Sequence, residues 1–297
     1  MPVIMNKNQD YDKPIKIGEG TFWVGHFDPV AGWLSSPYLI IDNGDAVLID
    51  AGSRDDFATV IMKTVQAGIV PSSIVALIYQ NYDPRLWGSL HHLENLIARS
   101  DLKIISDRAN LQFMQRHSGE AALMSVDEID HRLELPSGRC LEFIKIPFAH
   151  SAGSFTTFDR NTGILFTGDL FSSYISDWSL LLALEPKCRT CGGIGMCADR
   201  HCQIQDILRF HQDMMSSERA LRLALDRIAA LPFRTVAPQH GSIICESEDI
   251  VVLCEVLASL KGVGIDAITG DRSFYELGDT SPIRDRLHPR GSGTVCR

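Results

Sequence analysis

The chain lacks the features that mark several large classes of protein. Its 297 residues contain no run approaching the roughly 18 consecutive apolar residues that a membrane-spanning helix needs. The opening residues 1–7 have no long apolar stretch of the kind found in a signal peptide. Clusters of Lys and Arg are also missing, and the formal net charge of −9 argues against a nucleic-acid partner. We therefore expect a cytoplasmic protein with neither a membrane nor a nucleic-acid partner.

The composition and the order of apolar segments instead favour a layered α/β protein. Hydrophobic residues make up 45% of the chain, which supports a sizeable core. Apolar runs of strand length, at residues 74–78 and 103–106, alternate with segments of helical periodicity, at residues 55–67 and 89–98. An Asn-Gly turn at residues 43–44 adds a hairpin. Strands that alternate with helices predict a sheet covered by helices.

Three of the predicted strands end in residues that bind transition metals. His150 follows one strand in the string Phe-Ala-His-Ser, Asp169 follows the next in Thr-Gly-Asp, and His240 follows a later one in Pro-Gln-His-Gly. Strand ends can meet at one edge of a layered sheet, and two imidazoles with a carboxylate suit a first-row transition metal. The sequence therefore predicts a metal pocket at such an edge.

The order and context of these strings resemble the metallo-β-lactamase superfamily. Within it, the likeness is to the flavodiiron protein core and its smaller relatives, the oxygen-binding di-iron proteins. The resemblance implies an α/β fold of the metallo-β-lactamase-like αββα sandwich type over residues 15–262. Residues 1–14 would then be an N-terminal extension, and residues 263–297 a polar tail or linker.

The second half of that family's metal site is altered in this chain. The family has a His-x-Glu-x-Asp-His string that leads into Gly-Ser-Leu, and alignment on Gly-Ser-Leu places Asn81, Asp83, Arg85 and Leu86 at its four ligand positions. Asp83 remains a strong ligand, and Asn81 offers a weak amide oxygen. Arg85 brings a permanent positive charge where the family has a carboxylate. His211 matches a family position at which an aromatic residue lies near the metals.

We expect one metal in this pocket, with iron and zinc both suited to its ligands. A second metal is not expected, because Arg85 replaces the carboxylate that it needs. The alternative is an empty pocket in which the Arg85 guanidinium pairs with Asp169 or Asp83 and supplies the charge of the missing cation. The residues expected as ligands are Asp83, His150, Asp169 and His240, with Asn81 as a marginal fifth.

Four of the eight cysteines lie within one short segment. They are Cys188, Cys191, Cys197 and Cys202, in a glycine-bearing loop that we place at residues 186–204. In a reducing compartment such a group indicates a metal site rather than disulfides. Four thiolates suit zinc or an iron–sulfur cluster, and the alternative is a loop of unliganded thiols.

Three functions are compatible with these patterns. The first is a sensor or binding module for dioxygen, nitric oxide or redox state, which would act on a signalling protein partner and could be a homo-oligomer. The second is a metal-dependent hydrolase, which the altered ligand string disfavours because a bound hydroxide needs the complete centre. The third is a catalytically inactive scaffold. The sequence leaves open whether the protein is an enzyme, because a fold alone does not determine function.

Overall fold

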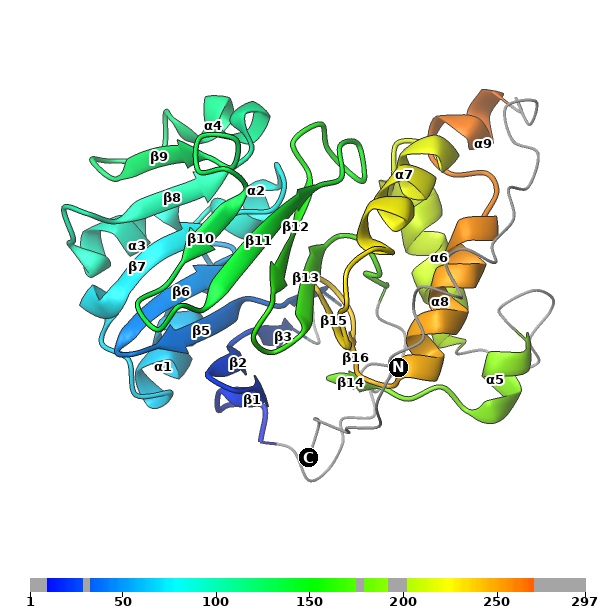
Figure 1. Ribbon diagram of the computed structural model, residues 1–297, viewed down its shortest axis with the longest axis horizontal. Coiled ribbons are helices and arrows are strands. Elements are labelled where there is room, and N and C mark those ends of the chain that lie inside the picture. The colour runs from blue at the N-terminus through cyan, green and yellow to red at the C-terminus, as the bar shows by residue number, and fades with distance from the viewer. Residues whose placement is uncertain (1–9, 29–32, 175–178, 192–201, 270–297) are drawn as a thin grey trace.

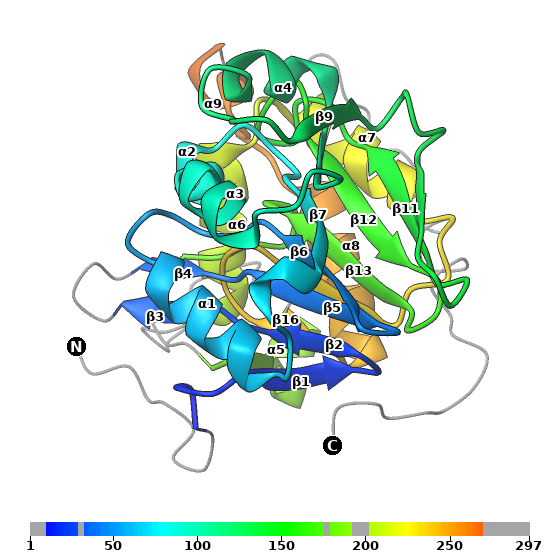
Figure 2. The ribbon, with the colours of Figure 1, turned by 90° about the vertical axis from the view of Figure 1, so that its left-hand side faces the viewer.

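The computed structural model describes residues 10–28, 33–174, 179–191 and 202–269. Within these residues two seven-stranded sheets lie face to face, and helices cover both outer faces (Figure 1 and Figure 2). The chain therefore forms the αββα sandwich that the sequence predicted. No helix of the described ranges is long and apolar enough to cross a membrane.

The first sheet contains the N-terminal strands and is covered by the early helices. Its strand order is β1-β2-β5-β6-β7-β8-β9. Its strands are Ile15–Gly18 (β1), Thr21–Trp23 (β2), Tyr38–Asp42 (β5), Asp45–Ile49 (β6), Ile74–Ile78 (β7), Lys103–Ser106 (β8) and Ala122–Ser125 (β9). The helices of this half are Phe57–Gln66 (α1), the 3-10 turn Pro71–Ser73 (η1), Pro84–Trp87 (α2), Leu90–Ile97 (α3) and Arg108–Met114 (α4). A separate hairpin pairs His26–Asp28 (β3) with Trp33–Ser35 (β4).

The second sheet is built from the C-terminal half and carries its own helical layer. Its strand order is β10-β11-β12-β13-β15-β16-β14. Its strands are Arg132–Glu134 (β10), Cys140–Lys145 (β11), Phe155–Asp159 (β12), Ile164–Gly168 (β13), Leu181–Leu182 (β14), Thr235–Pro238 (β15) and Ile243–Ile244 (β16). The helices are Pro186–Cys191 (α5), Gln203–Met214 (α6), Glu218–Ile228 (α7), Ser247–Ser259 (α8) and Ile265–Thr269 (α9).

Alternation along the strands divides the apolar residues between the layers. In β7, Ala76 and Ile78 pack between the two sheets, whereas Leu77 and the following Tyr79 pack under the helices. Successive side chains of a strand point to opposite faces, so a strand buried on both faces is apolar throughout. A third apolar cluster lies between the second sheet and α6, α7 and α8.

One edge of the sandwich gathers the ends of strands from both sheets. β13 and β15 are parallel neighbours, with Gly168 paired to Pro238, so the residues that follow them leave the sheet side by side. Gln80, which follows β7, donates from Nε2 to the backbone oxygens of Phe155 (3.1 Å) and Phe166 (2.9 Å) in the other sheet. This side chain therefore joins the two sheets at the edge where the predicted site lies.

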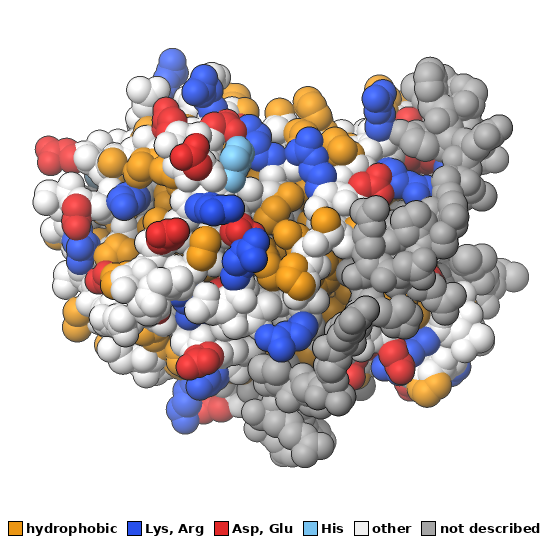
Figure 3. All heavy atoms as spheres, in the orientation of Figure 1, with side chains coloured by type: hydrophobic (Ala, Val, Ile, Leu, Met, Phe, Trp, Pro, Cys, Tyr) orange, Lys and Arg blue, Asp and Glu red, His pale blue; other side chains and the backbone are white. Residues whose placement is uncertain are grey.

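The described structure continues past the boundary expected at residue 262. Val263 is fully buried, and the Ile265 amide at the start of α9 bonds to the Ser216 oxygen. The segment expected as a Cys-rich loop likewise begins with a helix, α5. On the face of the molecule in Figure 3, acidic and basic side chains are interspersed.

Candidate functional site

Asp169 lies in a strained turn directly after β13. Its side chain is 1% exposed. Gly168 before it and Phe171 after it both have positive φ angles, +58° and +67°. A positive φ is easy for glycine but costs a residue such as Phe, so other contacts must hold this turn. The Thr167 hydroxyl donates to the Leu170 oxygen across it at 2.5 Å.

One oxygen of the Asp169 carboxylate faces His150 and Asn81. His150 Nδ1 lies 3.0 Å from Asp169 Oδ2, and the Asn81 amide donates to the same oxygen. His150 has φ of +90°, a rare conformation for a non-glycine residue, so its loop also stores strain at the site. Asn81 Oδ1 is buried and accepts no hydrogen bond from the described residues. This amide could present Oδ1 to a cation by turning over.

The other oxygen of Asp169 faces His240. His240 Nε2 lies 3.6 Å from Asp169 Oδ1, and Nδ1 donates to the Leu34 oxygen at 2.6 Å. The carbonyl partner fixes the proton on Nδ1 and leaves the Nε2 lone pair directed at the carboxylate. Gly241 follows with φ of +95°, and a Cβ there would lie 2.3 Å from Ser173 Oγ. The Gly in the His-Gly string therefore lets the chain turn tightly after His240.

Arg85 forms its ion pair with Asp83 and not with Asp169. The Arg85 Nε donates to Asp83 Oδ2 at 2.8 Å, and the Arg85 amide donates to Oδ1 at 2.8 Å as Asp83 caps α2. The Arg85 side chain is 44% exposed, whereas Asp83 is 7% exposed. Arg85 thus pairs with one of the two carboxylates expected for it. Asp83 lies near the pocket, but its lone pairs are directed at the guanidinium.

Charge in the pocket is balanced by the side chains themselves. Burial opposes the charge on His150, but the contact with Asp169 outweighs it and raises the His150 pKa. Burial would raise the Asp169 pKa, yet the His150 contact and charge keep it below its usual value. Asp50 lies close by, and burial together with repulsion from Asp169 and Asp83 raises its pKa to about 8. Burial lowers the His240 pKa.

His211 contacts the backbone of the turn that carries Asp169. Its Nε2 accepts the Phe171 amide at 3.0 Å, and its Nδ1 donates to the Ile207 oxygen at 2.7 Å within α6. Its neighbour Phe210 is also close to the site, with its ring centroid 6.0 Å from that of His240. Two consecutive residues of α6 therefore lie near the pocket.

The two sides of Asp169 differ in the ligands that they could offer a metal. Two ligand atoms about 2.1 Å from one metal lie about 3 to 3.4 Å apart at angles of roughly 90 to 110°. The 3.0 Å separation of His150 Nδ1 from Asp169 Oδ2 fits this, and the 3.6 Å separation of His240 Nε2 from Oδ1 is slightly long. The His150 side adds the Asn81 amide, whereas no described hydrogen bond adds a further donor on the His240 side, and Leu86, at an aligned ligand position, is buried in the apolar cluster under the helices of the first sheet.

This division explains why the described residues contain no group of three or more His, Cys, Asp or Glu side chains placed to hold a metal ion. Each side of Asp169 has one imidazole and one carboxylate oxygen, and the third donor on the better side is an amide. On this donor count the His150 side suits a metal better than the His240 side, where the described contacts give only His240 and one carboxylate oxygen.

The described cysteines do not converge on a metal position either. Cys188 and Cys191 lie in α5, and Cys202 precedes α6. Cys188 and Cys202 are half-buried against the apolar cluster beneath the helices, and Cys191 is exposed. Cys197 lies outside the described residues.

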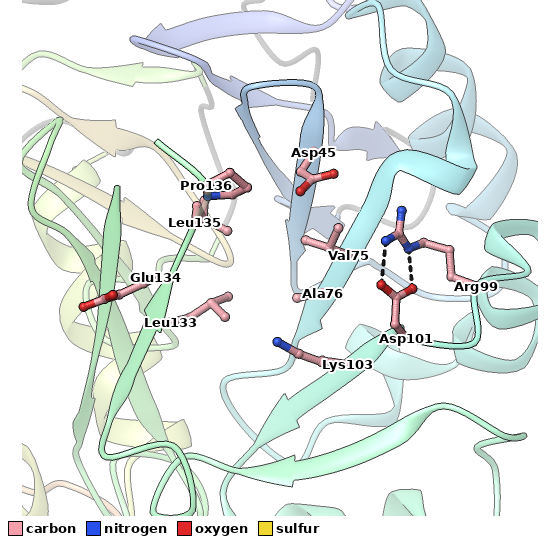
Figure 4. A pocket seen from close by; sticks show the side chains of 10 residues that line it. All are labelled: Asp45, Val75, Ala76, Arg99, Asp101, Lys103, Leu133, Glu134, Leu135 and Pro136. Carbon is pink, nitrogen blue, oxygen red and sulfur yellow. Dashed lines mark hydrogen bonds and ion pairs between the residues drawn. The ribbon is translucent and has the colours of Figure 1, made fainter. Parts of the chain in front are cut away.

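A hollow of about 330 Å³ opens away from Asp169, near the opposite ends of the strands (Figure 4). It is lined by Val75 and Lys103 of the first sheet and by Leu133 of the second. Arg99 there pairs with Asp101 through two bonds of 2.8 Å. These groups satisfy one another and show no convergence of donors on a ligand.

Comparisons with known proteins agree with this architecture. Putative diflavin flavoprotein A 1 from Nostoc sp. is 24% identical over 208 residues, which cover 69% of this chain and 33% of that protein. The chain thus spans about a third of the length of the curated relatives that it matches first.

Solved structures show the same fold. The peroxy di-iron species of the chemotaxis sensor ODP matches with a TM-score of 0.68 and 23% identity, over 86% of this chain and 98% of that one. Rubredoxin oxygen:oxidoreductase from Desulfovibrio gigas matches with a TM-score of 0.67 and 16% identity, over 83% and 61%. The family model described as ODP family beta lactamase matches residues 34–241. That range is most of the sequence, and the chain therefore belongs to the ODP family of beta-lactamase-fold proteins.

Proposed function

We propose that the chain is a binding module in which one non-haem iron, held at the His150 side of Asp169, binds dioxygen or nitric oxide and acts as a sensor. The observation that carries the proposal is the division of the Asp169 carboxylate, with His150 and Asn81 on Oδ2 and His240 alone on Oδ1. Iron would supply an open coordination position for a diatomic ligand. The chain's own residues would orient it and shield it from water.

The charges of the pocket support one metal rather than two. Arg85 stands where the resemblance places a carboxylate. Replacing a negative group by a positive one makes the local charge more positive by the charge of one divalent cation. The guanidinium binds both oxygens of Asp83 and neutralises a buried carboxylate that would otherwise need a cation. Arg85 therefore replaces the charge of a second metal.

A sensor role also agrees with the relatives. One matched structure is named as a chemotaxis sensor in a peroxy di-iron form. A signalling protein partner would then read the state of the pocket. The hydrolase alternative is less well supported, because a hydroxide held between two metals needs ligands that Leu86 and Arg85 do not provide.

Anaerobic loading with ferrous iron tests this function. We expect about one iron per chain, and a nitric oxide adduct with the electron paramagnetic resonance signal of a single high-spin iron rather than of a coupled pair. His150→Gln serves as the matched variant because it leaves the His240 side intact. A parent protein that binds no iron above the level of this variant would exclude the proposal.

We also propose that Cys188, Cys191, Cys197 and Cys202 hold zinc or an iron–sulfur cluster. The support is their placement: Cys188 and Cys191 lie in α5, Cys202 directly precedes α6, and Cys188 and Cys202 pack against the same apolar cluster. Metal and acid-labile sulfide analysis of anaerobically purified protein distinguishes the two. Cys191→Ser should lower that content, whereas Cys140→Ser, at a distant strand, should not. Equal content in both variants would contradict the assignment.

A further inference from the structure

The turn that carries Asp169 needs support from outside itself. Phe171 is 1% exposed and has φ of +67°, so its amide is buried in a conformation that a Phe residue adopts at a cost. Two side-chain hydrogen bonds, from Thr167 to the Leu170 oxygen and from Ser172 to the Gly168 oxygen, close the turn locally, together with the backbone bonds of the Leu170 and Ser172 amides. None of them satisfies the Phe171 amide.

His211 supplies the missing contact from a different layer of the fold. Its Nε2 accepts the Phe171 amide at 3.0 Å, and the side chain is fully buried. The Nδ1 bond to the Ile207 oxygen at 2.7 Å requires the ring proton to be on Nδ1, because a carbonyl can only accept. Nε2 is then an acceptor, as the Phe171 amide demands. One ring thus ties α6 to the Asp169 turn.

We propose that His211 is a positioning residue, which holds the Asp169 turn in the one conformation that directs Oδ2 toward iron at the His150 side. The iron-binding consequence of this inference rests on the proposed function, whereas the role of His211 in holding the turn is independent of it. Burial lowers the His211 pKa to about 4, so the ring stays neutral and keeps its acceptor at physiological pH.

The His211 ring makes two hydrogen bonds, one to the Phe171 amide and one to the Ile207 oxygen, and two substitutions separate their roles. His211→Gln places an amide oxygen as many bonds from Cβ as Nε2, so it can still accept the Phe171 amide. His211→Asn places its amide group as far from Cβ as Nδ1, so it can still bond the Ile207 oxygen but cannot reach Phe171. Both variants remove the ring and its packing, which makes them matched controls for stability.

The first measurement is amide hydrogen exchange in the metal-free protein. We expect the Phe171 amide of His211→Asn to exchange at least about tenfold faster than that of His211→Gln when both are compared at equal global stability. The second is ferrous iron affinity. We expect His211→Asn to bind iron about tenfold or more weakly, and His211→Gln to stay within about threefold of the parent.

The outcomes separate the two proposals. Equal exchange at Phe171 in the two variants would overturn the positioning role, whatever the iron data show. If the Phe171 amide is protected differently in the two variants but their iron affinities are equal, the positioning role is also overturned, because the turn would then not control the Asp169 ligand. A parent that binds no iron defeats the proposed function, and the exchange data alone then decide whether His211 holds the turn. Should His211→Asn not fold, His211→Met takes its place, since it fills the space without an acceptor oxygen.

Discussion

The two sides of the Asp169 carboxylate have unequal surroundings. On the Oδ2 side lie the His150 imidazole and the Asn81 amide, both polar and both close. On the Oδ1 side lies His240, with its proton committed to the Leu34 oxygen. Under the proposed function, substitutions in a single string of sequence remove one half of a two-metal site while the strand-end histidines of both halves remain.

The largest effect should come from the group that both sides share. Asp169→Asn removes the charge at the centre of the pocket, so we expect iron affinity to fall by about 100-fold or more. Isothermal titration under anaerobic conditions measures it. Asp213→Asn, at an exposed carboxylate that accepts from Tyr174, is the control and should bind iron as the parent does. Full iron content in Asp169→Asn would place the metal elsewhere.

The two histidines test the comparison directly. His150→Ala should weaken iron binding by about 10- to 100-fold, because it removes one of the two strong ligands on the Oδ2 side. His240→Ala should change affinity by no more than about threefold. Equal losses would mean that one metal lies between both imidazoles, as the sequence alone suggested, and that the two sides act as one site.

Restoring the second side should restore a second metal. Arg85→Asp combined with Leu86→His restores a carboxylate and an imidazole at the positions where the resemblance has ligands, and frees Asp83 from its ion pair. We expect iron to rise from about one to about two per chain, measured by metal analysis. Leu86→His alone should leave the content near one. A double variant that stays at one would show that Arg85 does not limit occupancy.

The last effect is on acid stability and not on iron binding. The folded pKa of His211, about 4, lies below the ordinary value of about 6.5, so its contribution is present above pH 6.5 and is lost as pH falls toward 4. His211→Gln cannot titrate. We therefore expect the stability advantage of the metal-free parent over His211→Gln to shrink by roughly 2 to 3 kcal/mol across that range. Denaturant melts at several pH values measure it, and a constant difference would argue against a neutral buried ring.

Much of the fold could be predicted from the sequence because its central strands are apolar and regular. The runs at residues 74–78 and 103–106 are β7 and β8 as expected, and the Asn-Gly hairpin joins β5 to β6. The short elements β9, β10 and α9 were not predicted, since three to five residues give too little periodicity to distinguish them from turns.

The residue types of the site were predictable, but their directions were not. Which oxygen of Asp169 each imidazole faces depends on how two sheets and a hairpin pack, and no local pattern encodes that. The bond from the Phe171 amide to His211 was not predictable for a related reason, because it depends on how α6 packs against the turn after β13.

The parallel pairing of β13 with β15 has a consequence for the order of folding. Asp169 and His240 meet only when strands separated by α6 and α7 have paired, and closing a loop of that length is slow compared with forming a hairpin. We therefore expect the pocket to be completed late, after its charged residues have begun to be buried. Because His150 compensates Asp169 and Arg85 compensates Asp83, we expect the polypeptide to finish folding without a metal. Under the proposed function, iron would then enter a protein that is already folded, and the folded apoprotein would persist where iron is scarce.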